Sequence, residues 1–282
     1  MSNFASGTYA DLAFVVLGQP IIVRYTPADV TWPDRLRAVL AAQVVANAPP
    51  DTTIIAVEQV ANELTPWHIS YDKYTHMLPD EDNLVHHLEW QLYTIGVRES
   101  ASTLAVHAGA VVRNNKVLLL PALSGKGKTT LTLALLAQGW QVLTDDVCPL
   151  EDSPHGLVAQ PCDRCCHVSE TTLAQLQQLG VTLNGPFADL SEYYRPPQWG
   201  TAAPIAWIVA PNFDPDAPLA VTPMTQAETA ALLIESSFQQ DQHTVRQQWQ
   251  AAIKLACQAK GVRLAFPALE QGLAAIAAIT QE

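Results

Sequence analysis

The sequence reads PALSGKGKTT from Pro121 to Thr130. This stretch follows the pattern G-x-x-x-x-G-K-[ST], the Walker A pattern of phosphate-binding loops, except that Ala122 replaces the first glycine. Gly127, Lys128 and Thr129 occupy the other fixed positions. Such a loop can turn its backbone N–H groups toward an anion at the start of a helix. The stretch therefore predicts a strand, a loop and a helix that together bind the phosphates of a nucleotide.

The residues that we expect to bind the nucleotide form one run along this loop. They are Ser124, Gly125, Lys126, Gly127, Lys128, Thr129 and Thr130. Lys128 would reach the β- and γ-phosphates, and the Thr129 hydroxyl would bind Mg²⁺. Ala122 requires only that the first residue of the loop adopt a φ that alanine tolerates. The expected ligands are ATP and Mg²⁺, and the alternative is a glycine-rich turn that binds no nucleotide.

The segments that flank the loop fit the same unit. Residues 104–112 and 116–120 read as two strands of a hairpin, because the asparagines between them tolerate positive φ. After the loop, residues 131–138 read as a helix and residues 140–144 as a strand. The predicted order is therefore hairpin, loop, helix and strand.

Two neighbouring carboxylates, Asp145 and Asp146, end that last strand. In a nucleotide-binding sheet, this position lies beside the γ-phosphate and its Mg²⁺. One carboxylate can hold the metal while the other takes a proton from an attacking hydroxyl. The alternative is a solvated pair of aspartates at a strand end.

The composition is acidic, with 27 Asp and Glu against 15 Lys and Arg and a net charge of −12. A global basic footprint is absent, so we expect no nucleic-acid partner. No apolar run approaches the roughly 18 to 20 residues that span a bilayer. Residues 1–10 lack a basic segment followed by an apolar core. We therefore expect no membrane association and a cytoplasmic location.

Five cysteines occur, at positions 148, 162, 165, 166 and 257. The run from Cys162 to His167 has the composition of a metal site, but no second ligand cluster with matching spacing lies elsewhere. Reduced thiols in a cytoplasmic protein are the alternative that we favour.

The remainder of the chain suggests two domains in an α/β protein. Strands are expected over 13–24, 52–57, 67–71, 205–210 and 262–266, and helices from Thr31 with apolar positions through Val45, from Asp80 to Arg98, and over 171–179, 226–238, 242–259 and 268–279. The first third carries no catalytic motif. We therefore expect an accessory or substrate domain of α+β type over 1–99 and a P-loop domain with a mixed sheet over 100–282.

The motifs together suggest a family. The run from His107 to Ala110, the hairpin, the loop and the pair Asp145-Asp146 resemble the kinase domain of bacterial HPr kinase/phosphorylase. They are more similar still to the smaller HPr-kinase-related proteins of peptide-modification gene clusters. The resemblance covers residues 100–165 with specific motifs and extends more loosely over the whole chain. It implies a kinase core related to phosphoenolpyruvate carboxykinase, with antiparallel strands before the P-loop.

The resemblance also implies roles for single residues. Asp145 would be the general base, and Asp146 its neighbour close to the metal. His107 would support Asp145, although a lone histidine on an apolar strand is more often a core residue. Arg164 would match a basic residue that faces the phosphates, but its neighbouring cysteines depart from the pattern of the family.

The implied function is an ATP- and Mg²⁺-dependent kinase that transfers the γ-phosphate to a hydroxyl. The relatives suggest a Ser or Thr of a peptide or protein, such as a ribosomally made precursor peptide. The glycine-rich segment that the family uses in phosphorolysis is not found here, so phosphorolysis is not expected. A nucleotide-binding regulatory module with little turnover and a generic NTPase are the alternatives. The related enzyme forms hexamers, so the resemblance is compatible with a homo-oligomer.

Overall fold

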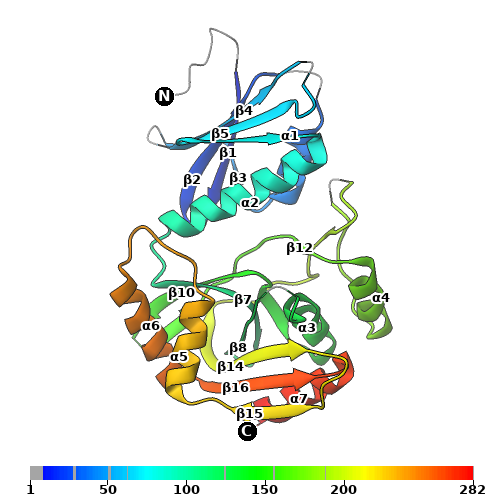
Figure 1. The fold of residues 1–282 in the computed structure, drawn as a ribbon, viewed down its shortest axis with the longest axis vertical. Helices are drawn as coiled ribbons and strands as arrows, with labels where there is room; N and C mark the ends of the chain where they lie inside the picture. Colours follow the sequence, from blue (N-terminus) through cyan, green and yellow to red (C-terminus); the bar gives the residue numbers. More distant parts are fainter. Residues whose placement is uncertain are drawn as a thin grey trace. The chain divides into compact units, whose positions relative to one another are not determined.

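The computed structural model describes residues 9–27, 30–49, 52–61, 63–123, 125–154, 156–187 and 189–281. The chain divides into two compact units (Figure 1). The smaller unit contains residues 1–100 and 186–191, and the larger unit contains residues 101–185 and 192–282. The sequence-based boundary lies between Glu99 and Ser100, and it leaves 186–191 with the C-terminal part.

In its described residues, the smaller unit is a six-stranded sheet with two helices. Its elements are β1 (Ala10–Val16), β2 (Gln19–Tyr25), α1 (Trp32–Val39), β3 (Val44–Val45), β4 (Thr53–Gln59), β5 (Trp67–Tyr71), β6 (Tyr74–Leu78) and α2 (Glu81–Glu99). The strand order is β3-β1-β2-β4-β5-β6. The α2 helix begins after Asp80, whose side chain accepts a hydrogen bond from the Asn83 N–H, and its residues Leu84, Leu88 and Leu92 are fully buried. This four-residue spacing gives α2 the apolar stripe that contacts the sheet.

The prediction of one strand over 13–24 is wrong. The run folds back on itself as the antiparallel pair β1 and β2. Leu17 and Gly18 form the turn, with φ of 50° and 81°, and glycine adopts such positive φ at little cost. The apolar pattern continues through the turn, so the sequence pattern did not indicate that a turn divides the run. In the next segment α1 ends at Val39, and Val44–Val45 pair with β1 in place of extending the helix.

The larger unit contains the elements that follow Ser100. They are β7 (Leu104–Arg113), β8 (Lys116–Pro121), α3 (Lys128–Ala134), the 3₁₀ helix η1 (Leu135–Gln138), β9 (Gln141–Thr144), β10 (Val147–Ser153), β11 (Gly156–Ala159), β12 (Cys166–His167), α4 (Glu170–Gln178), β13 (Tyr193–Tyr194), β14 (Ala203–Phe213), β15 (Ala220–Pro223), α5 (Gln226–Glu235), α6 (Val245–Gln258), β16 (Lys260–Phe266) and α7 (Leu269–Gln281).

The main sheet of this unit is mixed. Its order is β11-β10-β7-β8-β14-β16-β15, and β9 also pairs with β7. The pairs β8–β14 and β14–β16 are parallel, whereas β7–β8 is the antiparallel hairpin expected from the sequence, with Asn114 and Asn115 at positive φ. A further pairing of β11 with β14 closes the strands β7, β8, β14, β11 and β10 into a ring. The expectation of an α/β chain with a mixed sheet is confirmed.

Helices cover both faces of the central strands (Figure 1). Leu118 and Leu120 of β8 belong to a buried cluster that includes residues of α3, α4 and α7. Val117 and Leu119 alternate with them and belong to a second cluster, which includes residues of α5 and α6. A strand that is buried on both faces reads as a continuous apolar run, as β8 does. Within the described ranges, no helix is long and apolar enough to cross a membrane.

Candidate functional site

The glycine-rich loop joins β8 to α3 inside the larger unit. Gly125 and Gly127 have φ of 79° and 82°, and a Cβ on Gly127 would lie 3.1 Å from the Phe213 Cβ. Both positions therefore favour glycine. Among the described residues, Ala122 is not one with a positive φ, so alanine is tolerated at the first position of the loop. Ser124 lies outside the described residues.

Gly109 explains how β7 and the loop's helix come together. A Cβ on Gly109 would overlap the Thr132 hydroxyl oxygen and lie 3.2 Å from the Thr132 Cβ. Lys128 Cγ would be 3.5 Å away. Because α3 packs so closely against β7 at Gly109, the first part of the Lys128 side chain lies next to Gly109. Gly109 is two residues along the strand from His107. Gly109 thus positions the site, a role that its place in the run from His107 to Ala110 did not indicate.

Gly109→Ala should destabilise the protein by about 1 to 3 kcal/mol, the usual range for overpacking a filled core. The double variant with Thr132→Ala should recover most of that loss, because the overlapping hydroxyl is gone. Its oxygen has no hydrogen-bond partner among the described residues, so its removal leaves no polar group unpaired. Urea unfolding of the two single variants and the double variant measures the coupling. Additive effects would contradict the close contact.

Asp146 is the centre of a charged cluster. Its carboxylate lies 2.8 Å from His107 Nε2 and 3.5 Å from Lys128 Nζ, and it forms an ion pair with Arg164. Lys128 Nζ and His107 Nε2 are also within hydrogen-bond distance of each other. Three residues predicted from the sequence as site residues therefore meet around the carboxylate of a fourth. His107 contacts Asp146, whereas the resemblance implied that it supports Asp145, because the pairing of β10 with β7 sets Asp146 beside it.

The sheet explains this meeting. His107 pairs with Val147 of β10, and the Ala108 N–H donates to the Asp146 carbonyl oxygen at 3.0 Å. Asp145 and Asp146 form the bend between β9 and β10, both of which pair with β7. The two aspartates are consequently fixed beside the strand that carries His107.

The charges around Asp146 keep it ionised. Burial opposes ionisation, but the hydrogen bond from His107 and the charges of Arg164 and Lys128 outweigh it and hold the pKa of Asp146 well below its usual range. The side chains of Lys128 and Arg164 are 8% and 9% exposed. Burial lowers the pKa of Lys128, although Asp146 and Asp145 act in the opposite direction.

Asp145 has a different environment. The residue is 5% exposed, and its burial together with the neighbouring charge of Asp146 raises its pKa to about 6. The Cys166 thiol forms a hydrogen bond with its carboxylate. Neighbouring carboxylates with pKa values pushed in opposite directions are typical of acid–base sites, because one can accept a proton near neutral pH while the other stays charged.

Asp145→Asn should become more stable relative to wild type as the pH rises from about 4 to 6. The carboxyl of Asp145 has an ordinary pKa of 3.8 and a folded pKa of about 6, so the folded wild-type protein binds this proton more tightly than the unfolded chain. Wild-type stability therefore falls across that window by about 3 kcal/mol relative to the asparagine variant, which has no proton to lose there. Urea unfolding at several pH values measures the difference, and a constant difference would contradict the raised pKa.

Two adjoining cavities surround the cluster. One, of about 430 Å³, is lined by His107, Lys128 and Asp146 together with Gly125, Gly127, Thr129 and Thr130 of the loop. A smaller one, of about 240 Å³, is lined by Asp145, Asp146, Arg164 and Thr129. The larger of these two is hereafter called the Lys128 cavity. Its volume lies in the range of small-molecule sites.

Thr129 and Asp146 line both of these cavities. Hydroxyl and carboxylate oxygens are the ligands that Mg²⁺ prefers. The two residues therefore fit the metal that the sequence predicted for them. Thr130, in contrast, is turned toward α4, where its hydroxyl lies 3.1 Å from that of Thr172. Lys126 is exposed and does not line either cavity.

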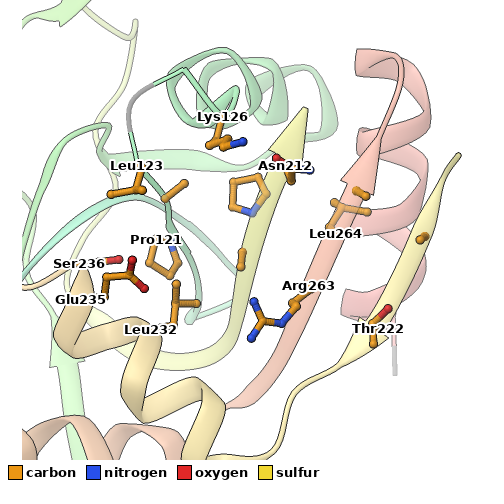
Figure 2. Close-up of a pocket in the computed structure, with 15 residues that line it drawn as sticks. Pro121, Leu123, Lys126, Asn212, Thr222, Leu232, Glu235, Ser236, Arg263 and Leu264 are labelled. Atoms are coloured by element: carbon orange, nitrogen blue, oxygen red, sulfur yellow. The ribbon is translucent and has the colours of Figure 1, made fainter. Parts of the chain in front are cut away.

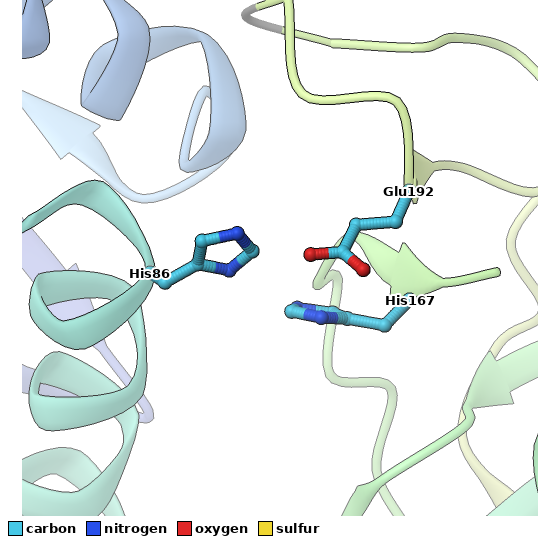
Figure 3. A group of neighbouring side chains, drawn as sticks. All are labelled: His86, His167 and Glu192. Atoms are coloured by element: carbon cyan, nitrogen blue, oxygen red, sulfur yellow. The ribbon is translucent and has the colours of Figure 1, made fainter. Parts of the chain in front are cut away.

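Sequence reasoning missed several residues at the site. His167 lines both cavities, and Ser169 and Thr172 line the Lys128 cavity. His167 was noticed only as part of the cysteine-rich run. Its ring packs against that of Tyr193 at 4.4 Å, and Figure 3 shows it beside Glu192 of the same unit. His86, drawn in the same figure, belongs to the smaller unit.

The cysteine-rich run packs as buried thiols. Cys162, Cys165 and Cys166 are all buried. Burial raises the pKa of Cys162 to about 12 and that of Cys166 well above its usual value. The Cys165 sulfur accepts a hydrogen bond from Arg195 Nε at 3.3 Å. In the described part of the chain, none of these cysteines belongs to a group of three clustered metal-ligand side chains. The described residues therefore provide no set of ligands for a metal at the cysteine-rich run.

Comparison with known proteins identifies no family. No protein-family model and no curated protein matches the sequence. Among solved structures, the chain is similar to one described as the HPr(Ser) kinase/phosphatase from Coxiella burnetii, with a TM-score of 0.33 and 12% sequence identity. The match covers 63% of this chain and 97% of the other. A TM-score of this size does not establish a shared fold, so the likeness carries no weight for function.

Proposed function

We propose that this protein is an ATP- and Mg²⁺-dependent kinase that transfers the γ-phosphate to a hydroxyl acceptor. One observation carries the proposal. The Asp146 carboxylate contacts His107, Lys128 and Arg164. Asp146, His107 and Lys128 line a cavity that residues of the glycine-rich loop also line. Buried cations beside a loop of this type are suited to phosphate groups. A buried aspartate with a pKa of about 6 lies next to them.

The transfer would use the residues as follows. The acceptor oxygen attacks the γ-phosphorus while its proton passes to the Asp145 carboxylate. The bond between the γ-phosphorus and the bridging oxygen breaks, and ADP leaves. A base whose pKa lies near the working pH is the most effective in such a step. Lys128 and Arg164 would balance the charge on the phosphoryl oxygens, where positioning and electrostatics provide most of the acceleration.

Thr129 and Asp146 would hold Mg²⁺. When bound, the metal neutralises charge on the β- and γ-phosphates. His107 would orient the Asp146 carboxylate through the contact of 2.8 Å. Asp146 is well suited to a ligand role because it remains ionised.

The acceptor is proposed on the sequence resemblance alone. A Ser or Thr of a peptide or protein, such as a ribosomally made precursor, follows from the HPr-kinase-related proteins. The contrasting possibility is a regulatory module that binds nucleotide without turnover.

Incubation with Mg²⁺ and ATP labelled in the γ-phosphate tests the function. A mixture of Ser- and Thr-containing peptides serves as the acceptor, and a mixture in which alanine replaces both residues serves as the control. A kinase transfers label to the first mixture only. ATP binding without transfer to any hydroxyl, across a broad panel of peptides, would favour the regulatory module.

A further inference from the structure

A third cavity borders the glycine-rich loop. It has a volume of about 460 Å³ and is formed by the loop, β14, β15, β16 and the end of α5 (Figure 2). We refer to it as the Arg263 cavity. Leu123, which is 58% exposed, lines both this cavity and the Lys128 cavity. The two spaces therefore adjoin at the same loop residue.

The lining of the Arg263 cavity is apolar at its base and polar at its rim. Pro121, Ala122 and Leu264 are buried. Arg263 and Glu235 reach the cavity from β16 and α5, as Figure 2 shows. Apolar walls with a few polar groups are typical of small-molecule and cofactor sites.

The cavity is separate from the acid–base groups. Asp145, Asp146 and His107 line the other two cavities and not this one. A hydroxyl acceptor has to reach Asp145, so this cavity does not suit the acceptor. A ligand that extends across Leu123 would have its charged end beside Lys128 and its less polar end here.

We propose that the Arg263 cavity binds the nucleoside part, base and ribose, of the nucleotide whose phosphates occupy the Lys128 cavity. This inference rests on the proposed function. The apolar base of the cavity contacts the faces of the ring, and the rim groups, including Asn212 and Thr222, face its polar edge and the ribose hydroxyls.

Tryptophan substitutions on the edge strand β15 test this assignment. Ala220 lines the cavity and is exposed, so Ala220→Trp fills it without disturbing the core. Val221, the next residue, is 46% exposed and does not line it, so Val221→Trp is the matched control. Thr222→Trp is a second cavity-filling variant should the first fail to fold. Calorimetric titration with ATP and with inorganic tripolyphosphate, each with Mg²⁺, compares a ligand with and without the nucleoside.

Ala220→Trp should weaken ATP binding at least tenfold and leave tripolyphosphate binding within twofold of wild type. Val221→Trp should change neither. If Ala220→Trp leaves ATP binding unchanged, or weakens both ligands equally, the nucleoside assignment is wrong while the phosphate site stands. If it spares ATP binding but blocks transfer to a peptide, the cavity belongs to the acceptor, which also overturns the assignment. A wild-type protein that binds neither ligand would instead overturn the proposed function.

Discussion

Asp145→Asn should reduce phosphate transfer by roughly 10²- to 10⁴-fold, the usual contribution of a general base. Asparagine keeps the size and the position of the side chain but cannot accept the proton of the acceptor hydroxyl. Because Lys128 and Arg164 form their ion pairs with Asp146, which the variant keeps, the affinity for ATP should change little. The expected pattern is thus a loss of turnover with binding retained.

Single-turnover transfer of labelled phosphate, together with ATP titration, measures both quantities. Asp152→Asn is the matched control, because Asp152 is an exposed aspartate of β10 that pairs with Lys254 at the surface. That variant should behave like wild type. If Asp145→Asn retains transfer within threefold of wild type, Asp145 is not the base. If it loses ATP affinity as well, its role lies in binding.

Lys128→Ala should reduce the rate of phosphate transfer by about 10²- to 10³-fold. This is the range seen when one preorganised group that stabilises the charge of a transition state is removed. The side chain is 8% exposed and is held by both His107 and Asp146. A water molecule in its place would provide neither the charge nor the fixed position. The variant should also bind ATP and tripolyphosphate weakly, because both ligands depend on this charge.

Lys254→Ala provides the comparison. It removes a lysine of the same charge from an exposed ion pair with Asp152, and exposed pairs contribute only about 0 to 1 kcal/mol. Transfer and binding should stay at the wild-type level. Equal losses in the two variants would show that net charge, and not the position of Lys128, governs binding.

The sequence predicted the parts of the larger unit that have strong local signals. The asparagines at 114 and 115, which adopt positive φ, indicated the hairpin, and the glycines at 125 and 127 indicated the loop. It did not predict β10, because Pro149 and the acidic residues after it resemble a loop more than a central strand. The pairing of β10 with β7 is a long-range contact, and it is this contact that sets Asp146 beside His107.

The candidate site shows the same division. Residue types and spacing along the chain were enough to select Lys128, Asp145 and Asp146 for it, whereas His107 was selected through the family resemblance. They could not reveal that Cys166 contacts Asp145 or that Gly109 allows α3 to approach β7. Both contacts depend on segments that are distant in sequence or on the packing of a helix against a strand. Nor did any motif mark the Arg263 cavity, which five elements form together.

Thermal unfolding of the wild-type protein, with and without ATP and Mg²⁺, tests the central claim most directly. A ligand present at a hundred times its dissociation constant adds about 2.7 kcal/mol of stability. We expect a clear rise in Tm for wild type and for Lys254→Ala, and none for Lys128→Ala. If millimolar nucleotide leaves the wild-type Tm unchanged, the Lys128 cavity is not a nucleotide site and the kinase proposal is wrong.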